Sequence, residues 1–221
     1  MQGTIGLGFN IVAVSVMSLI NPVLAPVPQL LLSLPQTAAS VAREHTGVDR
    51  SGVAWILAGR LPGAVIGVWL LSIATDRLLD VLIGLLVLIA VVILATGVHV
   101  RRNRTIEFSA GVFAGISSYV STIGGPPMAL LYSRSEGATI RATLGLIFFI
   151  GTSITIIARI IAGDIARTDW ILALALFPAA ALGFSLSSWM KERAAPSQLR
   201  KAILIVSAAA AVALLIRAAL G

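Results

Sequence analysis

The sequence predicts an all-α integral membrane protein made of two homologous helical repeats, and three observations support this. Of its 221 residues, 58% are hydrophobic and only 11% are charged, about half the charged fraction of a typical soluble domain. Long uncharged runs recur, and about 20 apolar residues let a helix cross a bilayer. Sequence patterns of the first half also return in the second half. The uncharged runs are 2–42, 81–100, 142–158, 170–190 and 202–216.

Three matching patterns define the repeat; they keep their order and lie about 116 residues apart. Internal duplication of this kind is common in membrane transporters. We therefore expect a first repeat at 1–104 and a second at 105–221, together forming one transmembrane domain. The matches are Thr4-Ile5-Gly6 with Thr122-Ile123-Gly124, Trp55 with Trp170, and Pro62 and Gly67 with Pro178 and Gly183.

Each repeat is predicted to open with a broken or re-entrant helix and to continue with three regular helices. Apolar stretches of helical length predict these elements, and short loops such as HTGVDR, RRNR and GDIAR separate them. In the first repeat, the broken segment extends to about residue 20, and helices follow at about 29–42, 51–73 and 78–100. In the second repeat, the broken segment lies at about 106–132, and helices follow at about 140–162, 168–190 and 199–220.

The broken segment of the second repeat contains STIGGPPM at 121–128, inside the uncharged stretch 108–133. Gly and Pro interrupt a helix, and irregular backbone at membrane depth is tolerated only where protein buries it or where it lines a cavity. Half-helices in transporters expose N–H groups that bind anions. We therefore expect a substrate-binding turn here and in the first repeat; the alternative is a packing turn that binds nothing. The expected site residues are Ser121, Thr122, Gly124, Gly125 and Pro126, with Thr4, Gly6, Gly8 and Asn10 in the first repeat.

Arg60 is expected to complete this site. It lies about nine residues into its predicted helix, which is about 14 Å at 1.5 Å per residue. An arginine inside the membrane is costly and is by default a functional candidate, here as a cation for an anionic substrate. The alternative is an arginine that reaches the interface or pairs with a carboxylate.

Other charged residues are expected to have structural roles. Arg141 and Arg159 flank helix 140–162 and are interpreted as anchors at the membrane interface. Arg43, Glu44 and Asp49 are interpreted as a solvated loop with local ion pairs.

The distribution of Lys and Arg favours broken segments that dip into the membrane and return. If each segment crossed fully, seven basic residues would fall on each side, with Arg217 in addition; if each returns, eleven fall on one side and four on the other. Basic residues concentrate in cytoplasmic loops. We therefore expect three crossings per repeat and inverted repeats, with the loops at 101–104 and 191–201 in the cytoplasm and the C-terminus outside.

The segments GISSYVSTIGGPPMALLY and RATLGLIFFIGT resemble the TauE/SafE family of membrane permeases, named for sulfite export. AREHTGVD and GRLPGAVIGVWLL in the first repeat resemble it too, so the resemblance extends over essentially the whole chain; GGPP is its most specific part. It implies a two-repeat helical transporter for small anions, typically sulfite, sulfonates or related sulfur compounds. The glycine-rich motif of the first repeat is present here as GLGFN.

These observations together predict a permease of the cytoplasmic membrane, with a small anion and the lipid bilayer as partners and without cofactor or metal. The formal charge of +7 comes from short basic clusters between apolar segments, which argues against nucleic acid as a partner. The chain contains no cysteine and no G-x-S-x-G, H-E-x-x-H or P-loop motif, so an enzyme is not expected. The alternative is a small membrane-embedded binding subunit of a multi-component transporter. The sequence leaves a homo-oligomer open.

The start of the chain carries one further expectation. Fourteen residues, FSAGVFAGISSYVS, precede the Thr-Ile-Gly triplet of the second repeat within its broken segment, but only Met1-Gln2-Gly3 precede that of the first repeat. We therefore expect the native protein to begin earlier, with a further apolar half-helix.

Overall fold

The computed structural model is all-helical over the residues that it describes and has no strand there. This confirms the predicted all-α class. The described residues are 17, 27–43, 47–96, 100–132, 137–191 and 196–220. The helices are α2 (Val27–Arg43), α3 (Arg50–Ser72), α4 (Asp76–Thr96), α5 (Arg104–Ser121), α6 (Pro126–Leu131), α7 (Gly137–Ala162), α8 (Arg167–Lys191) and α9 (Pro196–Leu220).

The helices coincide closely with the predicted ranges. The short helix expected at 29–42 is present as α2, and the helix expected at 78–100 is α4, which ends earlier, at Thr96. Pro35, Pro62 and Pro178 lie inside α2, α3 and α8 without ending them. Membrane helices tolerate such prolines because neighbouring groups can satisfy the backbone carbonyl that the proline leaves free.

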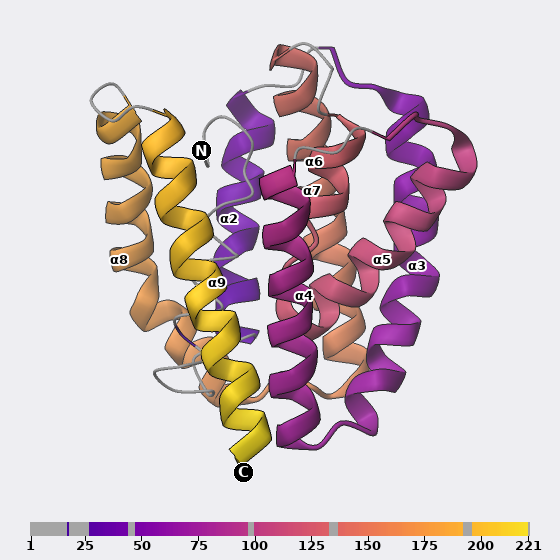
Figure 1. Ribbon diagram of the computed structural model, residues 1–221. Coiled ribbons are helices and arrows are strands. Elements are labelled where there is room, and N and C mark those ends of the chain that lie inside the picture. The colour runs from indigo at the N-terminus through magenta and orange to yellow at the C-terminus, as the bar shows by residue number, and fades with distance from the viewer. Residues whose placement is uncertain are drawn as a thin grey trace.

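The broken segment predicted at about 106–132 forms a hairpin of α5 and α6. Thr122 ends α5 in the left-handed region with φ 57°, and its N–H donates to the Ser118 carbonyl at 3.0 Å. The chain leaves α6 near the point where it enters α5, because Arg102 before α5 lies 3.3 Å from the hydroxyl of Tyr132 after α6. In Figure 1 the start of α5 and the short α6 both lie toward the upper end of the bundle. The hairpin therefore returns to the end from which it enters, as the charge distribution predicted.

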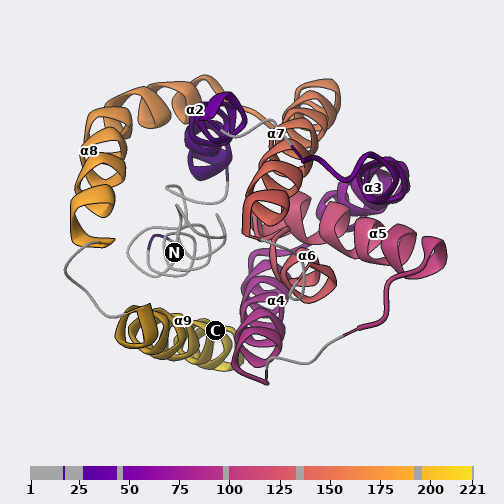
Figure 2. The same cartoon turned by 90° about the horizontal axis from the view of Figure 1, so that it is seen from above.

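Glycines bring α3 and α5 into backbone contact. A Cβ atom added at Gly59 would lie 2.1 Å from the Phe108 carbonyl oxygen, and one added at Gly111 would lie 2.1 Å from that of Ile56. Small residues four apart let two membrane helices approach this closely. Figure 2 shows α5 crossing beside α3. The contacts at Gly59 and Gly63 place the hairpin against the middle of α3. The spaced glycines are Gly59 and Gly63 on α3 and Gly111 and Gly115 on α5.

The remaining helices pack in pairs around the hairpin. α4 contacts α9, α2 contacts α7 and α8, and α3 contacts α7. In Figure 1, α2, α4 and α8 run from the lower to the upper end, and α3, α7 and α9 run the opposite way. An ion pair between Arg217 and Asp80 joins α9 to α4 near the lower end.

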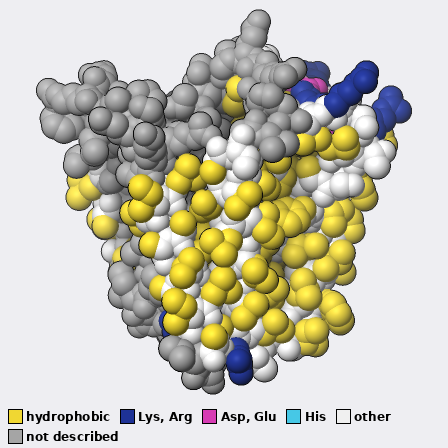
Figure 3. Space-filling model, in the orientation of Figure 1, with side chains coloured by type: hydrophobic (Ala, Val, Ile, Leu, Met, Phe, Trp, Pro, Cys, Tyr) yellow, Lys and Arg dark blue, Asp and Glu magenta, His cyan; other side chains and the backbone are white. Residues whose placement is uncertain are grey.

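The described outer surface is apolar along the helices. Figure 3 shows hydrophobic side chains over α4 and α9, with the visible Lys and Arg near the two ends of the bundle. Exposed residues there include Leu85, Ile89 and Val92 on α4 and Ile205 and Val212 on α9. By length and composition, two helical stretches of the described chain could cross a membrane, Arg50–Ser72 and Ala142–Ala162.

Candidate functional site

Arg60 lies where three helices meet. It is in α3, and its side chain is buried, with 2% of the residue exposed. Its Nη2 donates to the hydroxyl oxygen of Ser118 on α5 at 2.6 Å, and its Nη1 donates to the carbonyl of Ile147 on α7 at 3.5 Å. The α3–α5 glycine contact therefore brings the guanidinium to the inner end of the hairpin.

The charge of Arg60 has no counter-charge in the described part of the chain. No carboxylate there lies within 4.0 Å of the guanidinium, and its Nε has no hydrogen-bond partner. Because the Arg60 side chain is buried, it does not reach the membrane interface, which was one alternative expected for it. Pairing with a carboxylate was the other, and no carboxylate of the described chain pairs with it. A buried cation is costly unless something pairs with it. The arrangement therefore suits an anion.

Two glycines make room for the guanidinium. A Cβ atom at Gly124 would lie 2.1 Å from Ser118 Oγ and 3.2 Å from Arg60 Nη2. A Cβ atom at Gly151 would lie 2.2 Å from Arg60 Cζ, so the guanidinium packs directly on the α7 backbone. The structure thus brings together Arg60 and Gly124, two residues that the sequence predicted for one site.

The turn between α5 and α6 presents N–H groups that have no acceptor in the part of the chain that the structure describes. Ile123, Gly124 and Gly125 are buried, and their N–H groups make no hydrogen bond within the described residues. Pro126 and Pro127 fill the first two positions of α6 and have no N–H, so the donors come from the turn itself. Unpaired buried N–H groups are rare, and successive ones in a turn form anion-binding concavities.

The other predicted site residues have different surroundings. The Ser121 hydroxyl donates to the Ser117 carbonyl at 2.9 Å, and the Thr122 hydroxyl donates to the Ser121 carbonyl at 2.7 Å. These two hydroxyls thus donate to backbone carbonyls of α5. The predicted first-repeat residues lie outside the described part of the chain; they are Thr4, Gly6, Gly8 and Asn10.

Sequence reasoning missed Ser118, Ile147 and Gly151. No motif marks Ser118 or Ile147, because their role depends on which helices meet. The glycine spacing of α3 and α5 is a usable signal, since it predicts that the two helices pack closely. That contact alone would have placed Arg60 beside the hairpin.

The interfacial role predicted for Arg159 is wrong. Arg159 is 2% exposed; its Nη2 donates to the Tyr119 carbonyl, and its guanidinium lies 4.5 Å from the centroid of the Tyr119 ring. The Tyr119 hydroxyl in turn donates to Asp164. Burial of Arg159 is tolerated because its guanidinium lies over the Tyr119 ring and donates to the Tyr119 carbonyl. The side chain of Arg141 lies outside the described part of the chain.

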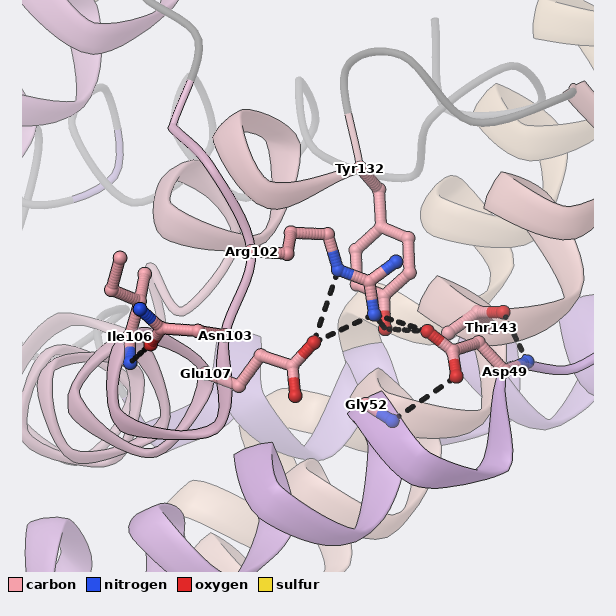
Figure 4. A network of polar contacts seen from close by, with 8 residues as sticks. All are labelled: Asp49, Gly52, Arg102, Asn103, Ile106, Glu107, Tyr132 and Thr143. Carbon is pink, nitrogen blue, oxygen red and sulfur yellow. Dashed lines mark hydrogen bonds and ion pairs between the residues drawn. The ribbon is translucent and has the colours of Figure 1, made fainter.

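The local ion pairs predicted for the loop before α3 are also wrong for Asp49. Figure 4 shows Asp49 paired instead with Arg102, which precedes α5. Arg102 also pairs with Glu107 at 2.7 Å and lies 4.2 Å from the centroid of the Tyr132 ring. A partner 53 residues away in sequence replaces the local ones because the α3–α5 contact brings the two helix starts together. The side chains of Arg43 and Glu44 lie outside the described residues.

The polar network around Asp49 and Arg102 links α3, α5 and α7 at the end of the bundle where the hairpin enters. The Asp49 side chain accepts from the Gly52 N–H at 3.1 Å, which caps α3, and the Asp49 N–H donates to Thr143 Oγ1 on α7 at 3.0 Å. Burial acts to raise the pKa of the Asp49 carboxyl, but its hydrogen bonds with Arg102 and Gly52 outweigh burial and hold the pKa below its ordinary value of 3.8. Arg102, Glu107 and Asp49 together tie the starts of α3 and α5 to the end of α6.

Comparison with known proteins identifies the family. The model of the family described as "Sulfite exporter TauE/SafE" matches residues 1–214. The chain belongs to the TauE/SafE family. One relative, the "Probable inner membrane transporter protein TsaS" of Comamonas testosteroni, is 29% identical over 184 residues, which cover 77% of this chain and 76% of the relative. No solved structure matches the chain. The TauE/SafE match confirms the resemblance seen in GGPP and its surroundings, and the protein is a membrane transporter.

Proposed function

We propose that this transporter moves a small anion, such as sulfite, a sulfonate or a related sulfur compound, across the cytoplasmic membrane, which it spans several times. The observation that carries the proposal is Arg60, a buried cation with no carboxylate beside it in the described chain. It lies against Gly124, at a turn whose N–H groups lack acceptors among the described residues. An anion supplies both the missing counter-charge and the missing acceptors.

The proposed substrate-binding site consists of Arg60, Ser118 and the turn that contains Gly124 and Gly125. Ser121, Thr122 and Pro126 shape this turn, and Thr4, Gly6, Gly8 and Asn10 contribute from the first repeat. Because Arg60 is only 2% exposed, an anion reaches it after the surrounding helices separate. Alternating access of this kind, around a site near the middle of the membrane, is how two-repeat transporters work.

The helix contacts support an inverted relation between repeats at 1–104 and 105–221. The contacting pairs include α4 with α9, α2 with α7, α3 with α7, and α2 with α8. If α2 is exchanged with α7, α3 with α8 and α4 with α9, the same four contacting pairs result; for example, the α3–α7 pair becomes the α8–α2 pair. The exchanged helices also run in opposite directions (Figure 1), which is expected of two repeats related by an axis in the membrane plane.

The proposed orientation places the loop at 101–104 in the cytoplasm and the loop between α7 and α8 outside. The chain has no native cysteine, so single cysteines report without background. In intact cells, a membrane-impermeant thiol reagent should label Ala166→Cys and leave Arg101→Cys unlabelled; both positions are exposed. The reverse pattern would invert the orientation.

Uptake into proteoliposomes tests the function. The purified chain should take up sulfite or a sulfonate without a partner protein, and Arg60→Gln should take up much less. Sulfite, sulfate, sulfoacetate and chloride are compared in the same vesicles. Binding of an anion without flux would contradict the proposal and indicate a binding subunit that depends on other proteins.

A further inference from the structure

Among the residues that the structure describes, the inner end of the hairpin offers a single formal charge. Ser118, Gly124, Ile147 and Gly151 surround the Arg60 guanidinium, and all of them are uncharged. No carboxylate of the described chain lies within 4.0 Å of this guanidinium. The residues before α2 cannot add a charged side chain either, because 2–42 contains no Lys, Arg, His, Asp or Glu.

Arg159 is a candidate for a second cation, but its guanidinium already has other contacts. Arg159 lies on the same helix as Gly151, but its guanidinium contacts the Tyr119 ring and carbonyl. The hydroxyl of the same tyrosine donates to the carboxylate of Asp164. Arg159 therefore has nearby negative charge of its own and does not supply a free positive charge to the site at Arg60.

A site with one positive charge discriminates between anions by their charge. An anion with one negative charge forms a neutral pair with Arg60, which is the arrangement that a buried environment tolerates. An anion with two negative charges leaves one of them uncompensated in the same environment, and that is strongly unfavourable. The N–H groups of Ile123, Gly124 and Gly125 add hydrogen-bond donors but no full charge.

The shape of the surroundings agrees with this charge. The N–H groups of the turn and Nε of Arg60 are donors for the three oxygens of an –SO3⁻ group. Ala114, Met128 and Ile147 belong to one buried apolar cluster next to these donors. Oxygen atoms on one side and an apolar group on the other are what a sulfonate presents.

We infer that the Arg60 site takes singly charged oxyanions, namely sulfonates and hydrogen sulfite, and rejects the doubly charged sulfate and sulfite ions. This rests on the function proposed above and specifies its substrate class. Sulfite is then carried in its protonated form, hydrogen sulfite. The pH dependence of sulfite transport therefore comes from protonation of the substrate and not from a titrating side chain at the site.

Uptake of three anions by wild-type proteoliposomes, with the membrane potential held at zero, tests the inference. Methanesulfonate carries one charge at every pH used, sulfate carries two, and sulfite changes from one to two charges near neutral pH. Methanesulfonate uptake should be independent of pH, and sulfate uptake should be below about one-tenth of it. Sulfite uptake should fall about tenfold per pH unit above neutrality, following the hydrogen sulfite fraction.

The outcomes separate the inference from the proposed function. Sulfate uptake equal to that of methanesulfonate, or sulfite uptake that stays constant with pH, overturns the inference and leaves an anion transporter. Absence of uptake for all three anions by folded protein overturns the function and the inference with it. Arg60→Lys keeps the single charge and should keep the preference for methanesulfonate over sulfate, whereas Arg60→Gln should lose methanesulfonate uptake. If Arg60→Gln does not fold, the uptake of methanesulfonate, sulfate and sulfite by the wild-type protein still tests the inference.

Discussion

Arg60 and Arg159 are both 2% exposed, and both contact the α5 part of the hairpin, but their guanidinium groups meet different surroundings. Arg159 rests on the ring and the carbonyl of Tyr119, with Asp164 hydrogen-bonded to the same tyrosine. Arg60 donates to the Ser118 hydroxyl and to the Ile147 carbonyl, and it lies against the turn at Gly124. No negatively charged group of the described chain lies beside it.

This difference shows that burial alone does not mark a binding arginine. Nε lacks a hydrogen-bond partner among the described residues in both arginines, but Arg159 rests on an aromatic ring and donates to a carbonyl, and these contacts stabilise the fold. A buried arginine whose charge is unmatched costs stability unless a ligand provides the match. The two residues should therefore respond to substitution in opposite ways, in stability and in substrate affinity.

The largest effect is expected for Arg60→Gln. A hydrogen bond to a charged group contributes about 1.5–3 kcal/mol, so we expect the KM for uptake to rise about 10- to 150-fold. The anion-free protein should be as stable as the wild type or more stable, because an unmatched buried charge is removed. Uptake kinetics and thermal unfolding, followed by fluorescence of the four tryptophans, measure both quantities. A loss of stability with unchanged KM would mean that Arg60, like Arg159, serves the fold and not the substrate.

Arg60→Lys sharpens the same test. Lysine keeps the charge but lacks the planar fork and the Nε donor. If charge attracts the anion, Arg60→Lys should raise the KM less than Arg60→Gln. Equal effects of the two substitutions would mean that the guanidinium shape, and not its charge, is what the site requires.

Gly151→Ala tests whether the position of the guanidinium matters. The new Cβ would lie 2.2 Å from Arg60 Cζ, so the guanidinium must move or the helices must shift, at a cost of about 1–3 kcal/mol. Uptake should fall strongly. Gly145→Ala on the same helix is the matched control, since its Cβ would meet nothing closer than 3.7 Å. Equal uptake by the two variants would show that the guanidinium position is unimportant.

Arg159→Gln should affect stability and leave affinity nearly unchanged. It removes the cation over the Tyr119 ring and the donor to the Tyr119 carbonyl, for an expected loss of about 1–3 kcal/mol. Thermal unfolding should show this loss, and the KM for uptake should stay within about twofold of the wild type. A KM rise as large as that of Arg60→Gln would place Arg159 in the binding site.

The smallest effect is expected for Asp49→Asn, which removes the ion pair of Asp49 with Arg102. The pKa of Asp49 in the folded protein is lower than the ordinary 3.8, so the ionised carboxylate stabilises the fold above pH 3.8, and this contribution is lost as the pH falls below 3.8 through the folded pKa. The difference in unfolding temperature between the wild type and Asp49→Asn should be constant above about pH 5 and should narrow below 3.8. A difference that does not change with pH would mean that the charge of Asp49 contributes nothing.

Much of the fold follows from local sequence. Apolar stretches and their polar loops predicted each described helix, and the Gly and Pro residues of STIGGPPM predicted the break between α5 and α6. The count of Lys and Arg predicted that the hairpin returns to its own end. These signals are local or additive, so they can be evaluated without knowing which helices meet.

The site could be predicted only in part. Arg60 and Gly124 were predicted for one site from two different signals, Arg60 from its depth in the helix and Gly124 from the broken turn. Ser118 and the Asp49–Arg102 pair depend on contacts between distant segments, which helical periodicity does not reveal. The anchoring role predicted for Arg159 is wrong because nearness to a helix end does not measure exposure, and Tyr119 and its neighbours bury this side chain.

The glycine contacts between α3 and α5 have a mechanical consequence. Where backbone lies against backbone, no side chain can change its rotamer to absorb a displacement, so the two helices resist sliding past one another. We expect α3 and the hairpin to shift as one stiff body while the other helices rearrange around them. Arg60 and the turn at Gly124 would then keep their spacing throughout the transport cycle, and the donors that hold the anion on one side of the membrane would be the same donors that release it on the other.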